Sequence, residues 1–217
     1  IYNKVIYKKY QNEYGSISKY CPNTIIGCSL SKNWGSGGYR YGWLKFPKNI
    51  INEDLLKLYK YSGGLASSIY TCPTTIMQYV GVEALSYSKN TVDYINFQNK
   101  MFDEVNSYCH KKLENMKLKC SNTKGAWYKL VNFNHYKQKL NKRNITTSED
   151  LSNALLKELH IVCVPGNYFG IKKELVLRLS MIDIKVNYNN FLTNKNKYDY
   201  INMKKCFEAL ENWLNNL

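Results

Sequence analysis

The alternation of apolar and polar residues predicts several short strands along the chain. An apolar run at residues 24–30 predicts a buried strand, and a polar, glycine-rich turn follows it over 31–38. Alternation over 41–46 predicts a second strand, which Pro47 ends. Three further strands are predicted at residues 125–133, 160–164 and 175–181.

Helices are predicted where apolar residues recur every three or four positions. They cover residues 52–61, 75–85, 91–119, 148–160 and 198–217. Asn52 is a candidate N-cap of the first helix, and Gly63-Gly64 is its predicted end. In the better of two frames, Thr147 and Asp150 form a capping box before the fourth helix. Strands and helices in this order predict an α/β portion that leads into an α+β domain.

Composition narrows the class of protein. The chain has 217 residues, 44% of them hydrophobic, which is enough for a core in one domain or two small ones. No run approaches the roughly 20 apolar residues of a membrane helix, and no signal peptide is expected. Seven irregularly spaced cysteines without a C-x-x-C pair predict reduced thiols and no metal site. An intracellular location is therefore expected, cytoplasmic first, with an organellar one left open.

The net charge of +15 raises the possibility of a nucleic-acid-binding protein. However, the positive residues are spread along the whole chain, and no RNP motif, helix-turn-helix signature or zinc knuckle accompanies them. Nucleic acid is therefore an unfavoured partner. Among 28 lysines there are only three arginines, Arg40, Arg143 and Arg178. Because arginine offers a planar, bidentate fork that lysine cannot copy, each one is a candidate for anion recognition.

One segment combines the residues that chemistry on amines requires. Ser29 precedes Lys32 by three residues, Arg40 follows it by eight, and Gly42 comes two further on. This segment resembles the cofactor-lysine signature of class I/II aminotransferases, which are fold-type I enzymes that use pyridoxal 5′-phosphate (PLP). The resemblance implies that Lys32 forms a Schiff base with the cofactor and later moves the substrate's Cα proton. It also implies that Ser29 and Arg40 bind the cofactor phosphate.

The resemblance extends to both sides of this segment. Ile1-Tyr2 resembles the end of the family's Asp-Glu-Ile-Tyr segment, which implies that the Tyr2 hydroxyl bonds the phenolic oxygen of PLP. The aspartate that pairs with the pyridine nitrogen would precede residue 1. Residues 162–170 resemble the family's V-P-G-x-x-F-G segment, and residues 177–180 resemble its L-R-L-S. Arg178 is thereby implied to grip the substrate α-carboxylate as a bidentate pair.

Two weaker similarities, at residues 67–78 and 125–128, assign no role to a single residue. The whole resemblance implies the C-terminal part of a PLP-binding large domain over residues 1–92 and a small domain over 93–217. It implies amino acid and 2-oxo acid substrates and a homodimer in the complete enzyme. Without the aspartate, weak or no turnover is expected of this chain alone. A non-catalytic fragment, a PLP-dependent lyase of the same fold and a basic nucleic-acid-binding protein are the alternatives.

Overall fold

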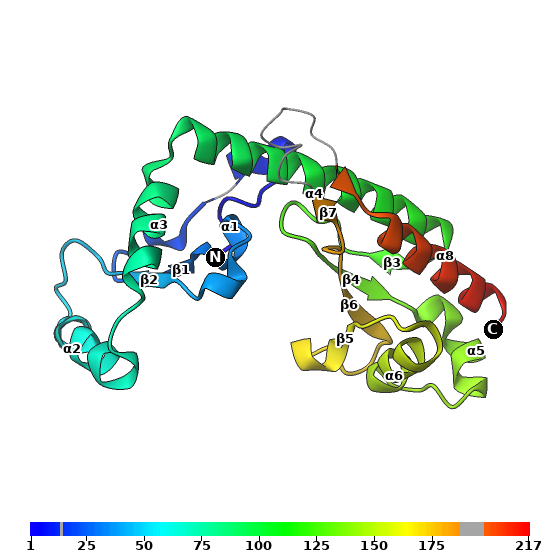
Figure 1. The fold of residues 1–217 in the computed structure, drawn as a ribbon. Helices are drawn as coiled ribbons and strands as arrows, with labels where there is room; N and C mark the ends of the chain where they lie inside the picture. Colours follow the sequence, from blue (N-terminus) through cyan, green and yellow to red (C-terminus); the bar gives the residue numbers. More distant parts are fainter. Residues whose placement is uncertain (14, 187–197) are drawn as a thin grey trace. The chain divides into compact units, whose positions relative to one another are not determined.

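A computed structural model describes residues 1–13, 15–186 and 198–217 (Figure 1). The chain divides into two compact units, Ile1–Asn99 and Lys100–Leu217. This division falls within helix α4 (Lys89–Asn115), the helix in which the sequence also placed its boundary between residues 92 and 93. Helices and short strands mix in both units, so the α/β class is confirmed.

The first unit contains an antiparallel pair of strands, β1 (Ile26–Ser29) and β2 (Gly42–Lys45). The strand predicted over 24–30 ends one residue early, because Leu30 already begins the short helix α1 (Leu30–Asn33). A single 3-10 turn, η3 (Gly37–Tyr39), leads from α1 back to β2. The predicted turn over 31–38 thus holds one helical turn at its start.

Two longer helices follow in this unit, α2 (Glu53–Tyr70) and α3 (Thr75–Ser86). The N-cap prediction is confirmed, since the Asn52 Oδ1 atom accepts a hydrogen bond from the Leu55 backbone N–H at 2.9 Å. The prediction that Gly63-Gly64 ends α2 is wrong. Glycine weakens a helix interior by only about 1 kcal/mol, so it does not stop one by itself. The helix ends where Thr71 adopts a φ of 66°. Two 3-10 segments, η1 (Lys8–Glu13) and η2 (Ile17–Lys19), precede the strands.

The second unit is built on a four-stranded antiparallel sheet in the order β3-β4-β6-β5 (Figure 1). Its strands are β3 (Lys119–Cys120), β4 (Tyr128–Asn132), β5 (Val164–Pro165) and β6 (Val176–Ser180). The strand predicted over 160–164 is wrong except at its last residue. His160 takes a left-handed conformation that ends the preceding helix, and pairing begins only at Val164. A separate pair, β7 (Lys185–Val186) and β8 (Tyr198–Asp199), follows.

Helices α5 (Lys137–Lys142), α6 (Ser148–Leu159) and α8 (Ile201–Asn215) complete this unit, with 3-10 segments η4 (Asn134–Tyr136) and η5 (Gly166–Phe169). The predicted capping box of α6 is confirmed, but α5 was missed. The helix predicted over 91–119 ends at Asn115, and Lys117 then adopts a φ of 57°. Apolar side chains from α4, α6, α8 and the sheet form one buried core, which includes Val105, Leu113, Val131, Leu151, Leu155, Leu177, Phe207 and Leu210.

Candidate active site

Lys32 lies in the single helical turn that joins the two strands of the first unit. The Ser29 Oγ atom caps this turn by accepting the Ser31 backbone N–H at 3.2 Å. Leu30 is buried and packs beside Met77 of α3, which fixes the turn against that helix. The Lys32 Nζ atom lies 6.0 Å from the centroid of the Tyr2 ring. The structure therefore brings together Tyr2 and Lys32, which are thirty positions apart in the sequence.

Arg40 lies at the end of the glycine-rich turn, two residues before β2. Its backbone adopts a φ of 54°, and its Nη1 atom donates to the Gly37 carbonyl oxygen at 2.9 Å. A guanidinium has five N–H groups, so others remain to bind an anion. Lys32, the Ser29 hydroxyl and this guanidinium occur within twelve residues of one another. An amine, a hydroxyl and a guanidinium are the donor set that fits the aldehyde and phosphate of PLP.

A buried polar network fixes the N-terminal segment to the lysine helix. The side chain of Asn33 is almost fully buried. Its Oδ1 atom accepts the Lys4 backbone N–H at 3.1 Å, and its Nδ2 atom donates to the Asn3 Oδ1 atom at 2.6 Å. Gln98 of α4 donates to the Asn33 carbonyl oxygen at 3.2 Å. Because these bonds are sheltered from water, they hold the segment that bears Tyr2 beside α1.

The sequence gave no signal that singled out this network. Asparagine is abundant throughout the chain, so Asn33 beside Lys32 does not stand out from solvated asparagines. Gln98 and Asn99 are adjacent polar residues that the long helix buries. Asn99 joins the same network by donating to the Lys4 carbonyl oxygen at 2.9 Å.

Helix α3 packs against the end of the glycine-rich turn and comes very close to it at one position. A Cβ atom added to Gly81 would lie 2.7 Å from the ring of Tyr41, closer than real side-chain contacts allow. A larger residue would force the Tyr41 ring to shift, so glycine lets α3 pack closely against the residue that follows Arg40. This contact links the end of the glycine-rich turn to the same helix that packs on Leu30.

Arg178 lies on β6 in the second unit, between two aromatic rings. Its guanidinium carbon is 4.5 Å from the ring centroid of Tyr128 and 5.0 Å from that of Phe169. Its Nε atom is buried and has no hydrogen-bond partner among the described residues. Rings that cover the faces of a guanidinium leave its edge free for a planar, bidentate partner such as a carboxylate. Sequence reasoning assigned no role to Tyr128 or Phe169, although both lie in segments that it identified.

The V-P-G-x-x-F-G-like segment is fitted closely to the strand that bears this arginine. Val164 pairs with Arg178 in the ladder between β5 and β6. A Cβ atom added to Gly166 would lie 2.7 Å from the Val176 carbonyl oxygen, so only glycine fits there. The chain then turns through η5 and brings Phe169 over the guanidinium.

The third arginine has a structural partner. Arg143 makes a bidentate ion pair with Glu158, at 2.8 and 2.9 Å, and lies 5.2 Å from the Trp213 ring centroid. The hydrogen bonds from Arg143 and then from the Trp213 indole lower the pKa of the Glu158 carboxyl. The anion that Arg143 recognises is thus a side chain of its own unit.

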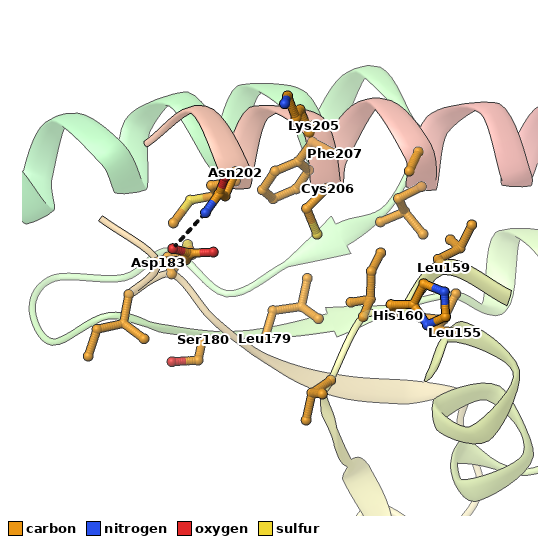
Figure 2. Close-up of a pocket in the computed structure, with 17 residues that line it drawn as sticks. Leu155, Leu159, His160, Leu179, Ser180, Asp183, Asn202, Lys205, Cys206 and Phe207 are labelled. Atoms are coloured by element: carbon orange, nitrogen blue, oxygen red, sulfur yellow. Dashed lines mark hydrogen bonds between the residues drawn. The ribbon is translucent and has the colours of Figure 1, made fainter. Parts of the chain in front are cut away.

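The second unit also contains a cavity of about 740 Å³ between α6, β6 and α8. Figure 2 shows Cys206 and Phe207 projecting from α8 into this cavity. Asp183 lies near Asn202, whose Nδ2 atom donates to the Asp183 Oδ1 atom at 3.4 Å. The lining is mostly apolar. None of the five predicted site residues lines this cavity, so it is distinct from the candidate active site.

The fold mixes helices with short antiparallel strands in both units, and comparison with known proteins names the family. A profile of the family described as "Aminotransferase class I and II" matches residues 1–189. The chain therefore belongs to the class I and II aminotransferase family.

Curated relatives agree with this assignment. The chain is 30% identical over 164 residues to an aspartate aminotransferase of Pyrococcus horikoshii, covering 75% of this chain and 38% of that protein. It is 25% identical over 181 residues to aromatic-amino-acid aminotransferase 2 of Thermococcus litoralis, covering 83% of this chain and 42% of that protein. The chain thus spans less than half the length of these two relatives.

Solved structures resemble the whole chain. An aromatic aminotransferase from Pyrococcus horikoshii matches 100% of this chain and 49% of its own, with a TM-score of 0.71 and 25% identity. A Thermus thermophilus aspartate aminotransferase mutant matches 98% of this chain and 48% of its own, with a TM-score of 0.72 and 19% identity, which shows the fold alone. Within the described residues, no helix is long and apolar enough to cross a membrane.

Proposed function

We propose that this chain supplies the cofactor lysine and the carboxylate-binding arginine of a PLP-dependent aminotransferase. The enzyme would move an amino group between an amino acid and a 2-oxo acid. The observation that carries the proposal is the position of Lys32, on a turn capped by Ser29 and beside Tyr2. Family membership supports the reaction class.

When bound, PLP supplies an aldehyde that bonds to amines and a ring that withdraws electrons from the neighbouring Cα–H bond. The Lys32 amine would hold the cofactor and, when free, would act as the base that accepts the Cα proton of the substrate. Ser29 and Arg40 bind the phosphate, and the Tyr2 hydroxyl donates to the phenolic oxygen.

In this proposal, Arg178 binds the substrate. Its aromatic neighbours fix the plane of the guanidinium, and its buried Nε–H requires an acceptor. A substrate α-carboxylate would provide that acceptor and would be held in one orientation. A lyase of the same fold would use the same lysine, so product analysis separates the two. Transamination leaves the carbon skeleton of the substrate intact, whereas a lyase breaks a bond in it.

We also propose that the complete enzyme forms a homodimer, because helices α2 and α3 of the first unit expose apolar side chains. These are Leu58, Tyr61, Leu65 and Ile69 of α2 and Ile76, Tyr79 and Val82 of α3. Exposed apolar surface of this extent is typical of protein interfaces. An intracellular location is also proposed, supported by seven cysteines that are all free thiols.

Reductive trapping tests the cofactor site directly. The purified chain would be mixed with PLP, reduced with borohydride, digested and mapped by mass spectrometry. We expect the pyridoxyl adduct predominantly on Lys32, and its loss in Lys32→Arg but not in the matched control Lys45→Arg on β2. Labelling spread over many lysines, with no preference for Lys32, would contradict an organised cofactor site and favour the non-catalytic fragment.

A further inference from the structure

Four titratable side chains from three elements meet at the edge of the sheet in the second unit. His110 and Glu114 lie one turn apart on α4, Cys120 lies on the edge strand β3, and Lys129 lies on β4. The His110 Nδ1 atom is 3.1 Å from the Cys120 Sγ atom, and its Nε2 atom is 3.3 Å from the Glu114 carboxylate. This cluster has no part in the proposed transamination.

The thiol, imidazole and carboxylate are arranged like the groups of a site in which a base activates a nucleophile. A thiol touches an imidazole nitrogen, and a carboxylate holds the opposite nitrogen. The imidazole can accept the thiol proton at Nδ1 while its Nε2–H donates to Glu114, which stabilises the imidazolium that forms. The His110 side chain is 33% exposed and Cys120 is half-buried, so a small reagent can reach the pair.

Lys129 places a positive charge beside the Cys120–His110 pair. It is 1% exposed, and its Nζ atom donates to the Ser121 carbonyl oxygen at 3.1 Å and to the Thr123 Oγ1 atom at 3.3 Å. The same Nζ atom lies 3.4 Å from the His110 Nδ1 atom. Burial raises the pKa of the Cys120 thiol, whereas the Lys129 ammonium opposes that rise. The resting thiol is therefore protonated at neutral pH, and its reactivity depends on a neighbouring base.

We propose that Cys120 is a peroxide-reactive thiol, with His110 as its base and Glu114 as the group that orients the imidazole. The sulfur attacks one oxygen of hydrogen peroxide as its proton passes to His110 Nδ1. The O–O bond breaks, and the departing hydroxide takes that proton and leaves as water. Sulfur is oxidised to a sulfenic acid and the peroxide is reduced. Lys129 stabilises the negative charge that develops on sulfur.

Other buried thiols of this unit provide internal comparisons. The Cys163 Sγ atom contacts the Ser152 hydroxyl, which is no base, at 3.6 Å. The Cys109 thiol donates to the Met203 sulfur, and burial raises its pKa to about 12. The contact with an imidazole thus separates Cys120 from both.

The test exposes the folded chain to hydrogen peroxide, traps sulfenic acid with dimedone and maps the labelled cysteines by mass spectrometry. We expect Cys120 to be labelled at least about tenfold faster than Cys163, because a positioned general base contributes that much or more. The imidazole that acts as this base faces Glu114, Cys120 and Lys129.

Substitution of the base provides the second measurement. His110→Asn should lower the labelling rate of Cys120 at least about tenfold, whereas the matched control His135→Asn, on η4, should leave it unchanged. The thermal unfolding of both variants would be recorded to show that they fold. Equal labelling of Cys120 and Cys163, or an unchanged rate in folded His110→Asn, would overturn the proposal.

Discussion

Single residues shape the surroundings of Lys32 in the first unit and of Arg178 in the second. Gly81 and Gly166 stand where a Cβ atom would collide with Tyr41 and with the backbone of Val176. Asn33 matters for the opposite reason, because its side chain is needed to satisfy buried backbone groups of the N-terminal segment. Each of these residues shapes the surroundings of Lys32 or Arg178. Gly166 belongs to the V-P-G-x-x-F-G-like segment, whereas Gly81 lies outside every motif found in the sequence.

Two glycine substitutions should change stability in opposite directions. Gly166→Ala places a methyl group 2.7 Å from a backbone oxygen, so we expect it to destabilise the second unit by about 1–3 kcal/mol. Gly63→Ala, in the middle of α2 with open space around it, should stabilise by about 0.5–1 kcal/mol. Urea unfolding followed by circular dichroism measures both. A Gly166→Ala variant as stable as the wild type would show that the backbone can yield at this turn.

At the scale of elements, the local sequence predicted where helices begin more accurately than where they end. The side chains of Asn52 and Thr147 cap α2 and α6 as their sequences predict. The ends of α2 and α4 were misplaced, because Thr71 and Lys117 stop them with left-handed backbone conformations that neither residue type favours. Such conformations are selected by the packing that follows them, which the local pattern does not contain.

The capping box of α6 should contribute measurably to stability. Thr147→Ala removes the side chain that accepts the Asp150 backbone N–H at 3.1 Å, so we expect a loss of about 1 kcal/mol. Thr74→Ala is the matched control, because Thr74 occupies the N-cap of α3 without making a side-chain cap. Thermal unfolding should distinguish the two variants. Equal effects at both positions would mean that the side-chain cap contributes nothing to α6.

At the scale of the whole molecule, the two units differ in how they bury their apolar residues. The second unit has a continuous core to which helices α4, α5, α6 and α8 and a sheet contribute. The first unit has a small buried cluster around Leu30, Met77 and Ala84, and it leaves much of α2 and α3 exposed. An interface is the ordinary reason for such a surface.

Self-association should therefore depend on the first unit. We expect sedimentation equilibrium to give twice the 25.4 kDa mass of a single chain, and the double variant Ile69→Lys/Ile76→Lys to return it to the single mass. Both side chains are 76% exposed. Val162→Lys, at a position 79% exposed in the second unit, is the control that should leave the mass unchanged. A monomer in the wild type would contradict the homodimer.

The sequence alone identified the family. The spacing of Ser29, Lys32 and Arg40, and the segment around Arg178, carried the resemblance because function restricts which residue types can stand there. The roles carried over to these residues and to Tyr2 stay predictions. Apolar periodicity placed most helices, since a helix that packs on a core must repeat its buried face.

Only the tertiary structure decided which side chains support those residues. The rings of Tyr128 and Phe169 meet at Arg178, although about forty residues separate them, because β4 and η5 both lie against β6. The asparagine network around Asn33 and the contact between His110 and Cys120 arise in the same way. Contacts between elements depend on packing in three dimensions, and one sequence does not specify which of its many asparagines, tyrosines or cysteines will meet.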